Sequence, residues 1–279
     1  MVLVTGASSG IGRECALRLA RDGFAVFGGV RRPEDGQTLV RDSGGTLFAV
    51  LLDVTDEATI AAAAAMVGEN AHPGDTFSLV NNAGITVAGP RELLPTAELR
   101  RQFDVNLFGP LAVTRAFLPL LRAHAGRIVL MGSIFGRISL PFVAPYTAAK
   151  AALGAVAESL SIELRAWSIP VVLIEPGNVA TPIWSRTKSS TVASMAGVAA
   201  EKIALYREAL ASFEKLTDGY ARSGIPPARV ARVVARALGA RRPRRRYAVG
   251  WDSRVFGRVA PLLPPRLRQW ILARITLRR

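Results

Sequence analysis

The chain has 279 residues, half of them hydrophobic, and carries a formal net charge of +15. This length and composition suffice to bury a large core in one globular unit. A disulfide-based scaffold is excluded because Cys15 is the only cysteine, and we expect this thiol to be buried and inert. A spanning helix is not expected, since no uncharged apolar run reaches about 18 residues.

The positive charge gathers near the C-terminus. Residues 241–279 contain 12 arginines and one aspartate, a net charge of +11, which leaves +4 for residues 1–240. We therefore expect one domain over residues 1–250 and a basic, amphipathic C-terminal extension over residues 251–279. The apolar run at residues 1–4 leads directly into a Thr-Gly turn, which indicates a strand and not an export signal, so we expect a cytoplasmic location.

Short apolar runs alternate with longer helical patterns along the first 250 residues. Such alternation predicts βαβ units, and the Val, Leu and Ile content of the runs suits strands covered on both faces. We expect an α/β fold with a Rossmann-type, doubly wound, mostly parallel seven-stranded sheet and helices on both faces. The predicted strands are Val2–Thr5, Ala25–Val30, Leu47–Leu52, Ser78–Asn81, Arg127–Met131, Val171–Glu175 and Tyr247–Val249. The predicted helices are Ile11–Asp22, Asp56–Gly68, Phe103–Ala123, Tyr146–Trp167, Ala199–Leu216 and Pro227–Leu238.

A glycine-rich segment, Thr5-Gly6-Ala7-Ser8-Ser9-Gly10-Ile11-Gly12, joins the first strand to the first helix. Glycines permit a tight turn close to a pyrophosphate, and a helix N-terminus offers free N–H donors and a positive dipole end. An ordinary βα loop can also be rich in glycine, but this loop has the strand–loop–helix context of a dinucleotide site. The candidate cofactor residues here are Gly6, Ser8, Ser9, Gly10, Ile11 and Gly12.

The residues after the second strand discriminate between NAD and NADP. An acidic side chain there accepts hydrogen bonds from a ribose 2′-hydroxyl, whereas an arginine suits a 2′-phosphate. Arg31 and Arg32 follow this strand, with no acid before Glu34. We therefore favour NADP(H), bound by Arg31 with assistance from Arg32, over NAD(H). In an arginine-rich chain, the same pair also fits a solvated surface.

Further motifs follow the later strands in order. Asp53-Val54 ends the third strand, Asn81-Asn82-Ala83-Gly84 follows the fourth, and Pro176-Gly177 follows the sixth. Each alone also fits a helix cap or a turn. With the Gly-x-x-x-Gly-x-Gly spacing of the glycine loop, they jointly resemble the short-chain dehydrogenase/reductase family over roughly residues 2–240.

The resemblance implies a place for each motif at a nicotinamide cofactor. Asp53 and Val54 would hold the adenine ring, and Thr181 would contact the nicotinamide amide. Asn81 and its neighbours would stabilise the sheet and line the cofactor. The other implied cofactor residues are Asn82, Ala83, Gly84, Tyr146, Lys150, Pro176, Gly177 and Val179.

Tyr146 and Lys150 lie four residues apart, on one face of a predicted helix. A nearby ammonium stabilises a phenolate and lowers the pKa of tyrosine from about 10, which suits a general acid or base. Such pairs are common by chance, but Ser133 stands thirteen positions before Tyr146, like the family's catalytic serine. The resemblance implies that Ser133 binds the reacting oxygen, that Lys150 also holds the nicotinamide ribose, and that Asn106 holds a relay water. No metal site is expected.

Ligands of such folds bind beyond the carboxyl ends of the strands. The segments available there, residues 85–89, 134–143 and 181–224, predict an apolar pocket. For Leu140 and Val143, packing in the domain core is an equal alternative. The other apolar candidates are Ile134, Phe135, Phe142, Ile183, Trp184 and Met195.

The stretches Phe24–Arg31 and Arg246–Asp252 resemble the retinol- and hydroxysteroid-dehydrogenase branch of the family. This implies a hydrophobic alcohol or ketone of steroid, retinoid or long-chain type. The alternative function is a non-catalytic dinucleotide-binding or scaffold protein, against which the presence of Ser133, Tyr146 and Lys150 argues. The resemblance also implies a homodimer or homotetramer, formed by the helices that begin near Phe103 and Tyr146.

From Pro265 onward, apolar residues fall on one face of a predicted helix and arginines surround it. This pattern suits peripheral contact with an anionic membrane. A helix docked on its own domain or on a subunit partner explains the pattern too, and we favour it slightly. Nucleic acid is not expected, because no recognition motif accompanies the charge. The residues are Leu267, Trp270, Ile271 and Ile275 on the face, with Arg266, Arg268, Arg274, Arg278 and Arg279 around it.

Overall fold

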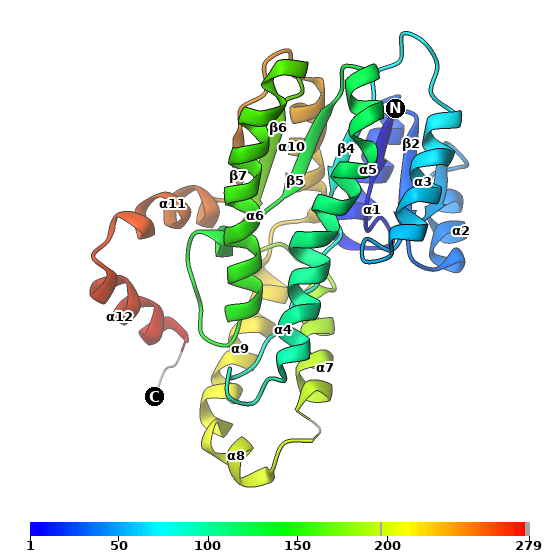
Figure 1. Cartoon of the computed structure of the whole chain (residues 1–279). Coiled ribbons are helices and arrows are strands. Elements are labelled where there is room, and N and C mark those ends of the chain that lie inside the picture. The colour runs from blue at the N-terminus through cyan, green and yellow to red at the C-terminus, as the bar shows by residue number, and fades with distance from the viewer. Residues whose placement is uncertain (196, 277–279) are drawn as a thin grey trace.

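The computed structural model describes residues 1–195 and 197–276, the side chains of residues 188 and 190 excepted. Its centre is a sheet in the order β3-β2-β1-β4-β5-β6-β7 (Figure 1). Every neighbouring pair is parallel, so the predicted doubly wound α/β fold is confirmed, and the sheet is wholly parallel. The strands are β1 (Val2–Val4), β2 (Val26–Val30), β3 (Leu47–Leu51), β4 (Ser78–Asn81), β5 (Arg127–Met131), β6 (Val171–Pro176) and β7 (Arg246–Val249).

Helices cover both faces of the sheet, and each face has its own apolar core. In β1, Val2 and Val4 join one core and Leu3 joins the other, because successive side chains of a strand point to opposite faces. Figure 1 shows the two helical layers on either side of the sheet. One layer contains α1 (Gly10–Arg21), α2 (Pro33–Asp42) and α10 (Pro227–Gly239), and the other contains α3 (Glu57–Glu69), α5 (Gly109–Ala123) and α6 (Ala144–Glu163).

The helix predicted over Phe103–Ala123 is divided in the structure. It consists of the end of α4 (Thr96–Phe103), a π-helical turn at Asp104–Phe108, and α5. Pro110 has no N–H to donate to the carbonyl four residues before it, so regular α-helical bonding cannot continue through this point. Such π-helical turns are frequent at functional sites. Here the turn carries Asn106, which is completely buried.

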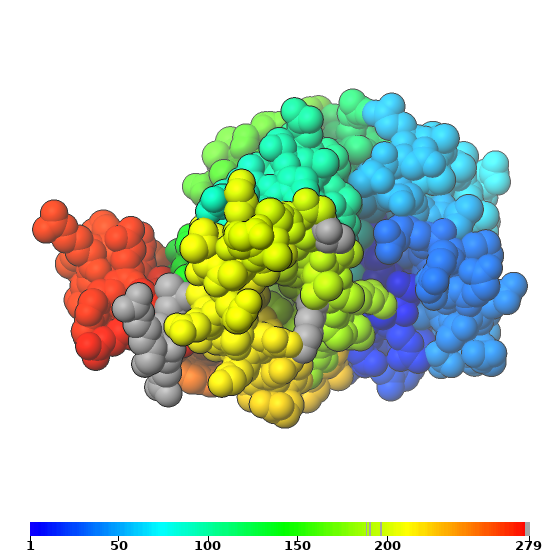
Figure 2. All heavy atoms as spheres, turned by 90° about the horizontal axis from the view of Figure 1, so that it is seen from below, coloured from blue at the N-terminus to red at the C-terminus, as the bar shows by residue number. Residues whose placement is uncertain are grey.

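Helices α7, α8 and α9 form a lobe (residues 183–223) beyond the carboxyl ends of the strands (Figure 1). α7 (Ile183–Ser194) was not predicted because it is rich in Ser and Thr, which compete with helical hydrogen bonds. The predicted helix over residues 199–216 is divided into α8 (Ala200–Leu205) and α9 (Arg207–Ser223). Seen from below, the lobe covers the middle of this face, while the chain's C-terminal part projects to one side (Figure 2).

The C-terminal arm (residues 251–276) continues from β7 with α11 (Trp251–Val259), a 3-10 turn (Ala260–Leu262) and α12 (Pro265–Thr276). The helix predicted from residue 265 onward is therefore confirmed. Figure 1 shows the arm standing out beside β7. Of the arginines assigned to this helix, Arg278 and Arg279 lie outside the described residues.

One side of α12 is docked and the other is exposed. Leu272 packs against the apolar cluster that joins the lobe to the domain, and Thr276 is buried. Leu267, Trp270 and Ile275 are exposed, Trp270 to 55%. Within the described residues, none of the helices is both long enough and apolar enough to span a bilayer.

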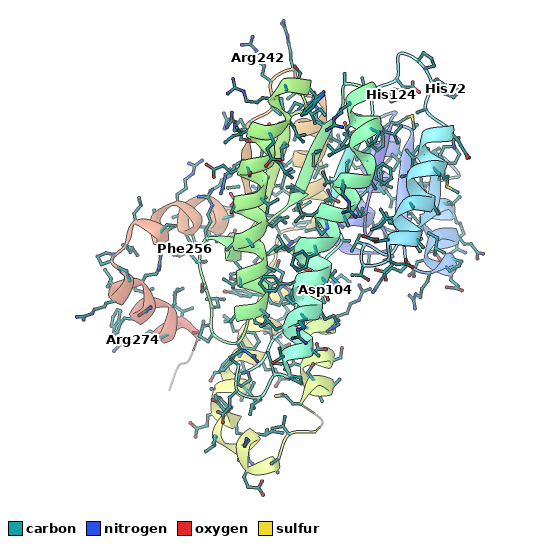
Figure 3. All side chains as sticks on the ribbon, viewed as in Figure 1. His72, Asp104, His124, Arg242, Phe256 and Arg274 are labelled. Atoms are coloured by element: carbon teal, nitrogen blue, oxygen red, sulfur yellow. The ribbon has the colours of Figure 1, made fainter. Side chains whose placement is uncertain are left out.

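Neither the two histidines nor the cysteine belongs to a group of side chains that could bind a metal ion in the described part of the chain. His72 and His124 stand at the end of the molecule opposite the lobe (Figure 3). Cys15 is buried in the core, and burial raises the pKa of its thiol, which keeps it protonated and unreactive. Across residues 1–195 and 197–276, no group of three His, Cys, Asp or Glu side chains is placed to hold a metal ion.

Candidate functional site

A cavity of about 310 Å³ lies between the carboxyl ends of the strands and α7. Because all strands are parallel, their carboxyl ends meet at one edge, which brings together loops from distant parts of the sequence. Two predicted site residues, Gly12 and Arg32, are absent from the described lining. The predicted residues that line the cavity are Gly6, Ser8, Ser9, Gly10, Ile11, Arg31, Asp53, Val54, Asn82, Ala83, Gly84, Asn106, Ser133, Tyr146, Lys150, Pro176, Gly177, Val179 and Thr181.

The glycine loop forms a cradle that larger residues would fill. Gly6 and Gly10 have positive φ angles of 66° and 56°, a conformation that side chains disfavour. A Cβ atom on Gly6 would lie 2.8 Å from the Cα of Ala83, and one on Gly10 would lie 3.3 Å from Cγ2 of Thr181. The loop backbone can therefore approach a ligand closely at the N-terminus of α1, which fits the pyrophosphate of a dinucleotide.

Gly12 is a packing residue and does not contact the cavity. A Cβ atom at this position would collide with the Gly6 carbonyl and the Asn82 amide. Its glycine is needed because helix α1 packs closely on the loop and the end of β4. The expectation that Gly12 contacts the cofactor is therefore corrected to a supporting role.

Thr5 and Asn82 tie the glycine loop to the loop after β4. The Thr5 hydroxyl accepts hydrogen bonds from the backbone N–H groups of Asn82 and Ala83, each at 3.0 Å. The Asn82 amide in turn donates to the Thr5 carbonyl at 3.0 Å. Asn81 points away, to the Thr114 hydroxyl at 2.9 Å, where it joins β4 to α5. Hydrogen bonds between residues far apart in the sequence thus hold the glycine loop against the loop after β4.

Only Arg31 of the predicted arginine pair lines the described cavity. Arg32 donates two hydrogen bonds of 3.0 Å to the carboxylate of Asp35 at the start of α2, and its side chain is 72% exposed. Its expected assistance at a 2′-phosphate is therefore not supported. Asp53 caps the next turn by accepting hydrogen bonds from Thr55. It also lines the cavity, and its contact with an adenine ring stays a prediction.

Ser133, Tyr146 and Lys150 come together at the floor of the cavity. Tyr146 and Ser133 both line this part of the cavity, and Ser133 is near enough to lower the pKa of the Tyr146 phenol. The Ser133 Oγ accepts the Phe135 N–H at 3.1 Å. Lys150 Nζ donates to the Met131 carbonyl at 2.6 Å and lies 5.8 Å from the centre of the Tyr146 ring. A proton donor, a hydrogen-bonding hydroxyl and an ammonium therefore face the same space.

Burial dominates the electrostatics of this group. It lowers the pKa of Lys150 from 10.5 to about 8, so the side chain still carries its charge at neutral pH. Burial also raises the pKa of Tyr146, and the hydrogen bond with Ser133 offsets only part of this rise. The expected lowering of the tyrosine pKa is corrected, because burial of the phenol raises it in this structure.

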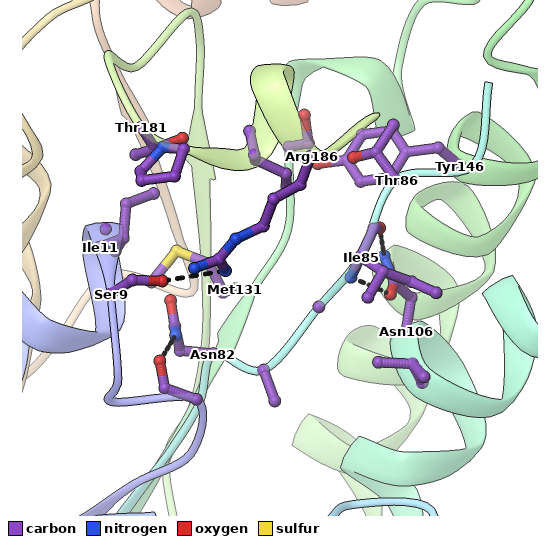
Figure 4. Close-up of a pocket in the computed structure, with 18 of the residues that line it drawn as sticks. Ser9, Ile11, Asn82, Ile85, Thr86, Asn106, Met131, Tyr146, Thr181 and Arg186 are labelled. Carbon is purple, nitrogen blue, oxygen red and sulfur yellow. Dashed lines mark hydrogen bonds between the residues drawn. The ribbon is translucent and has the colours of Figure 1, made fainter. Parts of the chain in front are cut away.

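Asn106 holds the chain after β4 with both ends of its side chain. It accepts the Ile85 N–H and donates to the Ile85 carbonyl, each at 2.9 Å (Figure 4). The side-chain amide therefore fixes this loop, and the role of Asn106 toward a relay water stays a prediction. Gln102, one helical turn earlier, supports the same loop through Val87 at 2.7 Å and Ile85 at 3.0 Å. This polar pair at i, i+4 was an available signal for Gln102 that the prediction overlooked.

The part of the cavity next to Tyr146 is apolar. The rings of Phe135 and Tyr146 meet edge to face at 6.3 Å, and those of Phe135 and Trp184 at 6.4 Å. Ile183 on α7 completes this lining. Leu140 and Val143 are buried in the same cluster as Phe135 but do not belong to the described lining of the cavity, which favours core packing for both. Ile134 and Phe142 belong to the same cluster, and Met195 caps the end of α7.

Comparisons with known proteins give a consistent result. A family model described as short chain dehydrogenase matches residues 1–191. The chain is 32% identical over 270 residues to the NADPH-dependent 3-dehydrocapnine reductase of Ornithobacterium rhinotracheale, covering 95% of this chain and 93% of that protein. It is 32% identical over 285 residues to retinol dehydrogenase 5 of Homo sapiens, covering 97% and 87%. A solved short chain dehydrogenase from Burkholderia cenocepacia J2315 in complex with NADP has a TM-score of 0.71 at 25% identity, covering 98% and 96%.

Proposed function

This chain belongs to the short-chain dehydrogenase/reductase family of oxidoreductases, and we propose that it interconverts a hydrophobic carbonyl compound and its alcohol with NADP(H). As in its relatives, the reaction is at a CH–OH group and uses a nicotinamide dinucleotide. The single observation that carries the proposal is that Ser133, Tyr146 and the buried Lys150 line the same cavity.

In the proposed mechanism, a bound nicotinamide supplies the hydride and the protein manages the proton. The Ser133 hydroxyl donates a hydrogen bond to the carbonyl oxygen and fixes its position. Tyr146 gives its proton to the same oxygen, since its raised pKa keeps the phenol protonated at neutral pH. The Lys150 ammonium stabilises the phenolate that remains. A protonated phenol is the form of Tyr146 that carbonyl reduction requires.

The preference for NADP(H) rests on Arg31. It lines the cavity at the carboxyl end of β2, where the adenosine ribose lies in folds of this type. The relative in Ornithobacterium rhinotracheale is described as NADPH-dependent, and the Burkholderia cenocepacia structure contains NADP. We infer the same preference here, with NAD(H) as the second cofactor.

We infer a substrate of steroid, retinoid or long-chain type from the apolar lining around Phe135, Ile183 and Trp184. The test is a panel of ketones, aldehydes and alcohols, half of them lipophilic, assayed by cofactor absorbance with NADPH and NADH. We expect the lipophilic carbonyl compounds to have the highest kcat/KM with NADPH. Turnover limited to small polar carbonyls contradicts the substrate class, and no turnover of any compound favours the scaffold alternative.

We further infer that the C-terminal arm rests on an anionic membrane surface, where a lipophilic substrate is concentrated. Its outward side chains include Trp251 and Leu262 besides the exposed face of α12. Arg266, Arg268 and Arg274 alternate with these apolar residues, and each basic residue near an anionic surface adds about 1 kcal/mol of attraction. The packing of Leu272 supports the alternative, a helix docked on its own domain. The outer face of α12 nevertheless stays exposed, since no described residue covers Leu267, Trp270 or Ile275.

We also infer self-association through α5, α6 and the turn between α4 and α5. Phe108, Ile162 and Trp167 are large apolar residues in this region that remain exposed. A homodimer or homotetramer would cover them. Light scattering on the purified protein tests this, and a monomer at micromolar concentration contradicts it.

A further inference from the structure

Arg186 of α7 reaches across the cavity to the glycine loop. Its Nη1 donates to Ser9 Oγ at 3.1 Å, although the two residues are 177 positions apart in the sequence. Figure 4 shows the side chain extending from the lobe toward Ser9, and both residues line the cavity. The guanidinium thus stands where a dinucleotide would lie, bound only to a neutral hydroxyl among the described side chains.

The effect of Arg186 on Asp35 indicates that its guanidinium lies toward the end of the cavity that would hold the adenosine. Hydrogen bonds from Arg32 lower the pKa of Asp35 most, but Arg186 and Arg31 both add to the lowering, with Arg186 ahead of Arg31. Since Asp35 lies at the start of α2, directly after β2, the Arg186 guanidinium lies near the segment that meets the adenosine ribose. Asp35 is occupied by Arg32, and neither Arg31 nor Arg186 is in an ion pair with a described carboxylate.

A phosphate monoester supplies the charge that this arrangement lacks. A ribose 2′-phosphate carries about −1.5 to −2 charges at neutral pH, more than Arg31 alone can neutralise. A guanidinium and a phosphate are both charged and frequently form two parallel hydrogen bonds, whereas the Ser9 hydroxyl offers Arg186 one neutral acceptor. Exchanging the Ser9 hydroxyl for a phosphate oxygen is therefore favourable for Arg186, and Ser9 is left free to donate to the same phosphate.

We propose that Arg186 is a second ligand of the NADP(H) 2′-phosphate, contributed by the lobe and acting together with Arg31. The proposal rests on the proposed NADP(H) dependence. It also links cofactor binding to the substrate pocket, because Ile183, Trp184 and Thr187 of the same helix line the cavity. Binding of NADP(H), but not of NAD(H), would then hold α7 against the glycine loop and complete the substrate pocket.

The test measures dissociation constants for NADPH and NADH by titration calorimetry, using the full-length protein. The variants are Arg186→Gln, Arg31→Gln and the control Arg207→Gln, an exposed arginine on α9 that does not line the described cavity. We expect Arg186→Gln to weaken NADPH binding about tenfold, the scale of one charge-assisted hydrogen bond, and NADH binding less than twofold. Arg207→Gln should change neither constant. Limited proteolysis of the lobe should be slowed by NADPH in the wild type and much less in Arg186→Gln.

Equal weakening of NADPH and NADH by Arg186→Gln overturns the proposal, because it indicates contact with the shared pyrophosphate. Unchanged binding of NADPH overturns it as well. Failure of the broader cofactor assignment gives a different result: the wild type would bind NADH more tightly than NADPH, and Arg31→Gln would leave that ratio unaltered. The Arg186→Lys variant separates charge from geometry, and we expect it to retain part of the NADPH selectivity.

Discussion

Substituting Tyr146 by Phe removes one hydroxyl and leaves the ring. The ring is held edge to face against Phe135 at 6.3 Å, a contact that phenylalanine preserves. The lost hydroxyl interacts with Ser133, so the free energy of unfolding should fall by about 1 kcal/mol, the value of one hydrogen bond. Loss of the general acid, in contrast, should reduce kcat by at least about a hundredfold.

The assay follows NADPH consumption with the best carbonyl substrate from the panel, together with the dissociation constant of NADPH and the Tm. Tyr220→Phe is the matched control, because it also removes one phenol hydroxyl. Tyr220 lies in the lobe, with its ring centre 5.7 Å from that of Trp184. We expect the control to retain kcat within about twofold and Tyr146→Phe to bind NADPH normally. A folded Tyr146→Phe protein with nearly normal turnover would refute the assignment of the proton donor.

Three further predictions concern pH, cofactor choice and the arm. The rate of reduction at saturating cofactor should fall as the pH rises through about 8, because Lys150 loses the proton that stabilises the phenolate; a flat profile from pH 7 to 9.5 would count against this role. Arg31→Asp should shift kcat/KM from NADPH toward NADH, since a carboxylate accepts from the 2′-hydroxyl and repels the phosphate; a wild type already faster with NADH contradicts the argument. Replacing exposed Leu267 and Trp270 with Glu should abolish co-sedimentation with anionic vesicles and leave turnover of a water-soluble ketone intact. If the unmodified protein ignores such vesicles at low salt, or if the variant splits an oligomer, the arm is structural.

The strands and the glycine loop could be read from the sequence because their causes are local. A run such as Val171–Pro176 is buried throughout, and its apolar composition alone indicates a strand covered on both faces. Gly6 and Gly10 stand where the backbone needs positive φ, and that requirement belongs to the residue itself. The spacing of Tyr146 and Lys150 on one helical turn is local in the same sense.

Contacts between distant segments depended on the tertiary structure. The sequence places Lys150 near Tyr146, but only the packing of α6 against the sheet brings its ammonium to the Met131 carbonyl and buries the phenol, which raises the pKa of Tyr146. Arg31 and Arg32 look equivalent as neighbours; Arg32 pairs locally with Asp35, three residues later, whereas the place of Arg31 at the cavity depends on the carboxyl edge of the whole sheet.

Arg186 shows the limit most clearly, because its partner Ser9 lies in the first βα loop and nothing in the residues around Arg186 indicates that contact. Its place at the cavity results from the lobe crossing the carboxyl edge of the sheet. The periodicity of apolar residues, the conformational freedom of glycine and the spacing of residues on a helix act over a few positions, so they can be predicted from the sequence. Which charged side chain meets which partner is decided by the closure of long loops, and that depends on the whole fold.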